Sequence, residues 1–338
     1  MRRAWPEAAR AAAAWRLVEP ATLDALVDLA LALEQAGEVA GATRAYEELA
    51  RWPGLPDAVR RTLGAHDWRR SAHGTAQVEI DHADGFGGQR LLERRETALV
   101  GDAALTGRGD VRAFARLGQG RLDSGDADQP FTQAQAGVRA WFGQGMSADA
   151  RLGTTRIGGA EALLVGARLA ARLSRSLAVE ATTSRSPFWE NRATVSARLQ
   201  AWTSGARLRL LGRGPVEASA GLDLTRLSDG NRRTQADVSV GRQVSRGPQV
   251  FELRASGVIF GYTEHRRSYF SPTAFGRLDV EVGVERWFGQ GAAVRDGRFT
   301  LRGRTGTGVD TRGVPYWLGG VGGVVPLAGR LSLIGDGR

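Results

Sequence analysis

The chain has 338 residues, no cysteine and a formal net charge of +10. The lack of cysteine excludes disulfides and thiolate metal sites, and no segment approaches the ~18 to 20 continuous apolar residues of a membrane-spanning helix. A basic protein can bind nucleic acid, anionic lipid or an acidic polymer. Here the arginines are interleaved with Asp and Glu and form no basic run, which disfavours nucleic acid. The four histidines have no metal-ligand or triad spacing, so we expect no metal, no cofactor and no enzymatic activity.

Residues 1–70 are predicted to form a helical segment, which we expect to be a separate structural unit. Apolar residues recur there at the 3.6-residue spacing of amphipathic helices. The pattern resembles a single tetratricopeptide repeat, with Leu29, Ala30, Gly37, Ala42, Tyr46 and Pro53 at the packing positions of that family. One such repeat cannot bury its own faces. It should therefore belong to a longer array or dock on the next part of the chain; a plain helical hairpin is the alternative.

From residue 75 to residue 338 the apolar period changes from 3.6 to two, which indicates β-strands with one polar and one apolar face. The segment RLDVEVGVE shows this most clearly, because Val280, Val282 and Val284 alternate with charged residues. Turn-rich joints such as SDGN and GRGP separate the segments. We count about sixteen segments of roughly ten residues, a typical pattern for an outer-membrane barrel. Their centres lie near residues 78, 95, 115, 137, 151, 165, 179, 196, 209, 220, 237, 255, 281, 302, 318 and 332.

The orientation of these strands decides the fold class. The apolar face is often Ala or Gly, which would make a thin core in a soluble sandwich. In an antiparallel outer-membrane β-barrel the same face meets lipid, and the charged face lines a hydrated lumen. We therefore predict an all-β barrel of about sixteen strands after the helical repeat, with a soluble β protein as the alternative. The predicted lumen-lining residues are Arg112, Arg116, Gln133, Gln135, Arg139, Trp141, Glu217, Asp223, Glu252, Arg254, Arg277, Asp279, Glu281, Glu285, Arg302 and Arg304.

Five tryptophans lie at or near the ends of predicted strands, where an interfacial aromatic girdle would fall. They are Trp141, Trp189, Trp202, Trp287 and Trp317. Some of them could instead face the lumen, where Trp141 or Trp287 would offer an aromatic surface to a passing sugar.

A compact corner, TEHRRSYFSPTAF, joins two of the clearest strand segments, and its Ser-Pro step interrupts strand pairing. The element Tyr269, Phe270, Ser271 and Pro272, with Phe275, resembles the C-terminal signature of the bacterial cellulose-synthase outer-membrane subunit and related exopolysaccharide-secretion porins. The order of repeat followed by barrel also agrees with that family. Two features depart from it: Arg266, Arg267 and Ser268 stand where the family usually has glycines, and only one repeat is clear.

The resemblance implies a pore in the bacterial outer membrane for a cellulose-like or related biofilm glycan. The polysaccharide would occupy the lumen, outer-membrane lipid would surround the barrel, and the periplasmic repeat would recruit glycan synthase components. The alternatives are a general porin, a structural barrel or a soluble scaffold or adhesin. A barrel enzyme is a further alternative, with His265 near Ser268 or Ser271 as its crude candidate. Neither the first residues, MRRAWPEAARAAAAW, nor the final GDGR has the expected terminal signal, so we expect a fragment or a start assigned late.

Overall fold

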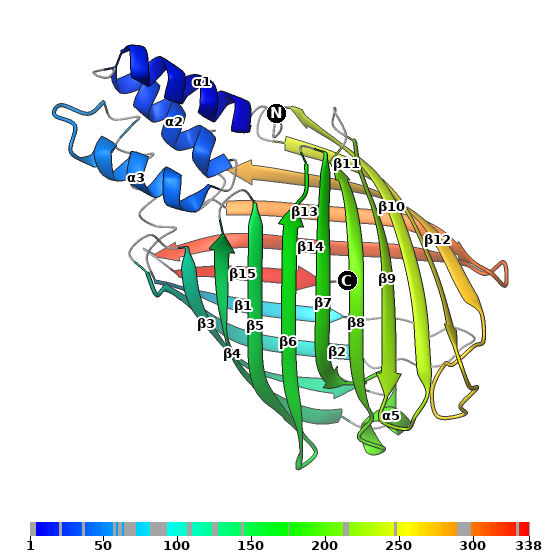
Figure 1. Ribbon diagram of the computed structural model, residues 1–338. Coiled ribbons are helices and arrows are strands. Elements are labelled where there is room, and N and C mark those ends of the chain that lie inside the picture. Colours follow the sequence, from blue (N-terminus) through cyan, green and yellow to red (C-terminus); the bar gives the residue numbers. More distant parts are fainter. Residues whose placement is uncertain are drawn as a thin grey trace.

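The structure is a computed structural model that describes most of the chain. The described residues are 5–19, 22–35, 38–56, 59, 63, 72–81, 93–106, 110–123, 128–142, 145–174, 176–211, 216–246, 249–288, 299–328 and 331–337. They form a small helical segment followed by a large barrel of strands (Figure 1).

Among the described residues of the first part of the chain are the helices α1 (Trp5–Val18), α2 (Leu23–Gln35) and α3 (Val39–Ala50). Their core contains Leu26, Ala30, Ala42, Ala45, Tyr46 and Leu49, all nearly inaccessible to solvent. The Tyr46 hydroxyl donates a hydrogen bond of 2.9 Å to Glu34 across the hairpin. Within the described residues, no helix has both the length and the apolar character needed to cross a membrane.

The predicted repeat positions fall in this helical hairpin to different extents. Ala30, Ala42 and Tyr46 are buried at the crossing of α2 and α3, as small and aromatic packing residues should be. Leu29 is only half-buried, and Pro53 is exposed just after α3. Gly37 lies outside the described residues.

The second part of the chain forms fifteen strands within the described residues. They are β1 (His73–Asp81), β2 (Glu93–Ala104), β3 (Val111–Asp123), β4 (Asp128–Phe142), β5 (Met146–Ile157), β6 (Ala160–Arg172), β7 (Leu177–Pro187), β8 (Gln200–Leu211), β9 (Val216–Leu227), β10 (Arg232–Arg246), β11 (Gln249–Tyr262), β12 (Phe275–Phe288), β13 (Phe299–Asp310), β14 (Pro315–Ala328) and β15 (Leu331–Gly337).

These strands close into a barrel. Each strand pairs antiparallel with its neighbours in the chain, and β1 closes the ring by pairing with β15 in parallel. Parallel closure results from the odd number of strands, because the first and last of an alternating series then run in the same direction. Closure leaves no unpaired edge, the condition that allows a sheet to exist in lipid.

The predicted strand near residue 196 is wrong. That segment contains a short helix, α5 (Arg192–Ser196), whose N-cap is Asn191. The Asn191 side chain accepts a hydrogen bond from the Thr194 amide, and the Thr194 hydroxyl accepts one from the Asn191 backbone amide. This reciprocal cap starts a helix where alternation alone indicated a strand. The expected count of about sixteen therefore becomes fifteen in the part of the chain that the structure describes. The segments near 95, 165 and 318, which alternate poorly, are strands β2, β6 and β14.

The apolar face of the sheet points outward. Leu278, Val280 and Val282 are 65%, 51% and 49% exposed, whereas Asp279 between them is only 6% exposed. The same contrast recurs around the barrel, where Leu117 on β3 is 62% exposed while Arg112 on the same strand and Glu96 on β2 are buried. A soluble β protein would show the reverse, so the outward set has the arrangement of a surface that meets hydrocarbon.

The two ends of the barrel differ. The helices lie beyond the end at which β1 begins, which we call the helix end (Figure 1). α5 and the connection from β11 to β12 lie at the opposite end, which we call the α5 end.

Candidate functional site

The inner face of the barrel is a wall of charged and amide side chains. The register of strand pairing places every predicted lumen residue on this one face, because each lies directly opposite another member of the inner set. The pairs include Arg112 with Arg139, Arg116 with Gln135, Arg254 with Glu281, and Glu285 with Arg302. The remaining predicted residues lie at inward positions of β4, β9, β11, β12 and β13. They are Gln133, Trp141, Glu217, Asp223, Glu252, Arg277, Asp279 and Arg304.

Ion pairs connect neighbouring strands across this wall. Arg168 on β6 lies 2.9 Å from Glu180 on β7 and 3.7 Å from Asp149 on β5. Arg209 on β8 also reaches Glu180, at 3.2 Å. Charge-assisted contacts of this kind hold the charged side chains in fixed positions along the inner wall.

Pairing continues on the other side of the ring. Arg207 lies 2.8 Å from Asp237, Arg254 lies 2.5 Å from Glu252, and Arg116 lies 2.7 Å from Glu96. Arginines and carboxylates occur in nearly equal numbers at the inward positions of the described strands. The wall therefore has little net charge, in contrast to the +10 of the whole chain.

Aromatic rings interrupt the charged wall. The Arg139 guanidinium lies 5.8 Å from the ring centre of Phe114 and 5.9 Å from that of Trp141. Arg233 stands in the same way 5.9 Å from Phe260 and 6.0 Å from Tyr262. These contacts are within the range of cation–π attraction.

The five tryptophans do not form one girdle. Trp202 and Trp317 are outward and 49% and 83% exposed, as an interfacial residue requires. Trp141 belongs to the inner set through its pairing with Ser147, and Trp189 packs inside the barrel against Phe131. Trp189 therefore does not belong to an outward girdle, and Trp141 lies on the inner face, the position given to it in the lumen-lining set. The side chain of Trp287 lies outside the described part of the structure.

Two cavities lie against the inner face. The larger, about 750 Å³, is lined by inward residues of β8 to β12. The smaller, about 320 Å³, is lined by residues of β9 to β14. Nine of the predicted lumen residues therefore border open space, and four of them, Glu217, Glu252, Arg254 and Glu281, line both cavities.

Two connecting segments fold onto the inner face at the α5 end. We call residues 188–199, between β7 and β8, and residues 263–274, between β11 and β12, the inner plug. Val195 and Trp189 of the first segment pack on Leu122, Phe131 and Ile157 of the inner wall. A second apolar cluster joins Phe188, Leu199 and Tyr269 of the plug to Ala201, Leu227, Phe260 and Tyr262 of the wall. The corner thus packs on inward side chains at the α5 end of the barrel.

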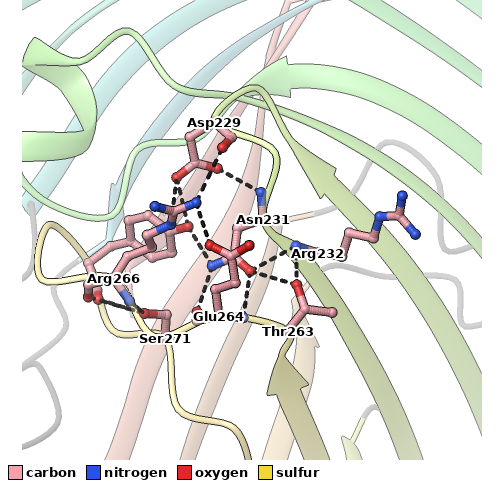
Figure 2. A network of polar contacts seen from close by, with 8 residues as sticks. Asp229, Asn231, Arg232, Thr263, Glu264, Arg266 and Ser271 are labelled. Atoms are coloured by element: carbon pink, nitrogen blue, oxygen red, sulfur yellow. Dashed lines mark hydrogen bonds and ion pairs between the residues drawn. The ribbon is translucent and has the colours of Figure 1, made fainter.

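The corner is fixed to the β9–β10 turn by buried polar groups (Figure 2). The Tyr269 hydroxyl accepts a hydrogen bond from Asn231 at 2.8 Å and donates one to Asp229 at 3.0 Å. Asn231 is fully buried, and its Oδ1 accepts hydrogen bonds from Thr263, Glu264 and the Arg232 amide. Burial and the Asp229 carboxylate raise the pKa of Tyr269 to about 12, so the phenol remains a donor at physiological pH.

The Ser-Pro step of the corner has a structural role. The Ser271 hydroxyl is buried, accepts the Arg266 amide at 2.5 Å and donates to the Arg266 carbonyl at 3.1 Å. The Pro272 carbonyl accepts the Tyr262 amide at 2.8 Å. Phe270 and Phe275 stack edge to face, with ring centres 5.2 Å apart. All five residues predicted for the corner thus hold the inner plug together.

The two segments of the inner plug are also joined to each other. The Asn191 side-chain amide donates a hydrogen bond of 2.8 Å to the Ser268 carbonyl, and the Glu190 carboxylate accepts one from the Phe270 backbone amide. Burial raises the pKa of Glu190 to about 7 against the opposing effects of that amide and of Arg233. Within the described residues, Glu190 Oε2 has no hydrogen-bond partner.

Sequence reasoning missed Glu190, Asn191, Asp229 and Asn231. A signal existed for three of them. Asn191 followed by Thr194 is an N-cap spacing, and SDGN marks a turn in which Gly230 adopts a φ of 91°. No local pattern marks Glu190, because its burial depends on residues that lie far away in the chain.

The geometry does not favour the enzyme alternative. His265 Nδ1 lies 3.3 Å from the Ser271 carbonyl, and the Ser271 hydroxyl is occupied by Arg266. A nucleophile needs its hydroxyl, and not its carbonyl, in contact with the base. The described residues contain no cluster of three or more groups that could hold a metal ion.

A closed antiparallel barrel with an apolar outside, a charged inside and a folded inner plug is a transmembrane-type β-barrel. A comparison with solved structures supports this fold class. Among solved structures the chain is similar to a bacterial polysaccharide outer membrane secretin, with a TM-score of 0.55 and 12% identity over 75% of this chain and 82% of that one. The chain therefore has the fold of an outer-membrane β-barrel.

Other similar structures are more distant. A loop-deletion variant of OmpT, an outer membrane protein of Vibrio cholerae, gives a TM-score of 0.43 and 10% identity over 75% of this chain and 96% of that one. An anion-selective porin from Comamonas acidovorans gives 0.39 and 9% over 73% and 90%. No family model matches the chain, and no curated protein matches it by sequence.

Proposed function

We propose that the protein is an outer-membrane pore that exports an exopolysaccharide, cellulose-like or related, from the bacterial cell. The single observation that supports this most is the inner face, where paired charges and aromatic rings surround open space while apolar side chains face outward. A sugar polymer forms many weak hydrogen bonds and stacks on aromatic faces. Such a wall offers both along its length without one deep binding site.

The balance of charge favours a polymer with little net charge. Because arginines and carboxylates neutralise each other on the wall, a strongly anionic chain would meet as many repulsive as attractive groups. The five-residue corner also resembles that of cellulose-secretion porins, which agrees with a neutral glucan. The helical segment would lie in the periplasm and bind a component of the glycan synthase.

The inner plug favours export over general diffusion. A general porin needs a permanently open channel, whereas here two segments pack on the inner wall at one end. We infer that the plug narrows the pore when no polymer passes. The α5 end would then face the outside of the cell, since the helices lie at the other end (Figure 1).

Conductance in planar bilayers tests this function. We expect small single-channel conductance in salt alone and concentration-dependent block by cello-oligosaccharides. Dextran fragments of equal length, whose linkage gives a different shape, should block less. Large conductance that no oligosaccharide reduces would favour a general porin and refute the proposal.

A further inference from the structure

A row of arginines crosses the outer surface near the α5 end, on four neighbouring strands. Arg185 on β7 lies opposite Trp202 on β8, Trp202 lies opposite Arg226 on β9, and Arg226 lies opposite Arg232 on β10. All four share the parity of outward residues such as Leu208. We call Arg185, Trp202, Arg226 and Arg232 the outer arginine row.

The cations of the outer arginine row have no carboxylate partner within the described residues. Arg185 donates to the amide oxygen of Gln200 at 2.8 Å, and neither Arg226 nor Arg232 forms an ion pair in this part of the chain. Figure 2 shows the Arg232 side chain extending away from the buried network that its own backbone amide joins. Two arginines directly opposite each other on adjacent strands repel. A bound anion would relieve that repulsion.

Outward arginines elsewhere at the same end have a carboxylate as a neighbour. Arg95 lies 2.5 Å from Glu93, and Arg121 lies 2.6 Å from Asp128. Arg156 stands opposite Glu161 in the register of β5 and β6. Among the described strands, the uncompensated positive charge is thus concentrated on β7 to β10 and is not a general feature of this rim.

The outer arginine row lies at the edge of the apolar band. On β9, Leu224 and Leu222 lie beyond Arg226 toward the helix end and are 54% and 49% exposed. On β8, Leu208 and Leu210 lie beyond Trp202 in the same direction and are 40% and 50% exposed. Tryptophan at such an edge marks the level of lipid head groups, where its ring is half in an apolar environment and half in water.

We propose that the outer arginine row binds a phosphate group of a phosphorylated glycolipid in the leaflet at the α5 end. Guanidinium groups bind phosphate oxygens in pairs of parallel hydrogen bonds, and Arg226 and Arg232 offer two such groups side by side. Trp202 would lie against the adjoining sugar or acyl region. This inference rests on the outer-membrane placement in the proposed function, but not on the identity of the exported polymer.

Native mass spectrometry of the full chain in neutral detergent tests the proposal. The probes are lipid A carrying its phosphates, dephosphorylated lipid A and inorganic phosphate. We expect wild-type protein to bind phosphorylated lipid A about tenfold more tightly than the Arg226→Ala/Arg232→Ala variant does, the loss expected for charge-assisted hydrogen bonds. Arg121→Ala, which removes a paired outward arginine, should bind as wild type. Dephosphorylated lipid should bind weakly to all three proteins, and millimolar inorganic phosphate should not displace the lipid.

Equal binding of phosphorylated lipid to wild type and to the double variant would overturn the proposal. So would equal binding of both lipids to wild type, a comparison that holds even if the double variant does not fold. Displacement by inorganic phosphate would overturn the lipid assignment in favour of a free anion site. Heat-modifiable gel mobility checks folding of each protein. Block by cello-oligosaccharides, measured on the same preparations, should be unchanged in the double variant. If cello-oligosaccharides do not block the wild-type pore while lipid binding is retained, the export function is refuted and the lipid proposal is not.

Discussion

Replacing Glu190 by Gln should remove the pH dependence of the inner plug. The Glu190 carboxylate lies between the two plug segments and has a pKa of about 7 instead of 4.5. An acid whose pKa is raised in the packed state holds its proton more tightly there than in an open state. The packed plug therefore has its full stability below about pH 4.5 and loses this contribution as the pH rises through about 7.

The size of the effect is set by the difference between the two pKa values. At ~1.4 kcal/mol for each pH unit, complete ionisation of Glu190 destabilises the packed plug by about 3.5 kcal/mol. That is about a three-hundredfold change in the ratio of open to packed plug. The phenol of Tyr269, with a pKa of about 12, does not titrate in the same window.

Single-channel recording between pH 5 and pH 8 measures the effect. We expect the open fraction of the wild-type pore to rise steeply across this range, whereas Glu190→Gln stays packed throughout. Glu264→Gln is the matched control, because Glu264 belongs to the same plug but is exposed and paired with Arg266 at 2.6 Å. The reasoning is refuted if Glu190→Gln keeps the wild-type pH dependence, or if the wild-type pore opens more readily at low pH.

Three further changes test other parts of the structure. Tyr269→Phe removes the donor to Asp229 and the acceptor of Asn231; it should destabilise the packed plug by about 1 to 3 kcal/mol, seen as more frequent opening at constant pH. Val282→Arg puts a charge on the outward face and should lower barrel stability in lipid by about 2 to 4 kcal/mol, measured by urea titration of folded protein in vesicles. Glu281→Gln, one residue away on the inner face, should cost far less, and equal losses would contradict the assigned orientation. Tyr46→Ala should destabilise the helical segment by about 3 to 5 kcal/mol, measured by helical circular dichroism on heating; pore conductance should not change, and a changed conductance would show that the helices shape the pore.

The orientation of the strands could be predicted from the sequence because it depends on a local property. Side chains on a strand alternate between two faces, so the neighbours of each charged residue in RLDVEVGVE lie on the opposite face. The inward parity of Arg277, Asp279 and Glu281 was evident from this pattern and agrees with the register of β12. The change from helical to strand periodicity near residue 75 was equally local.

The inner plug could not be predicted in this way. Its packing joins residues 188–199 to strands β3 to β5 and to residues 263–274, which are separated from it by tens of positions in the chain. The segment near 196 alternated well enough to suggest a strand, but the Asn191 cap and the contacts of Val195 made it a helix at the α5 end of the barrel. The raised pKa of Glu190 has the same origin, since its burial is created by distant residues.

Alternation by itself thus determined which residues face lipid and which face the interior, because that choice is made between adjacent positions. The closed ring, the parallel junction of β1 with β15 and the packing of the inner plug at the α5 end were decided only by the tertiary structure. Each of these depends on how many strands complete the circle and on which connections fold back into it. Those are properties of long-range pairing that no short stretch of the chain contains.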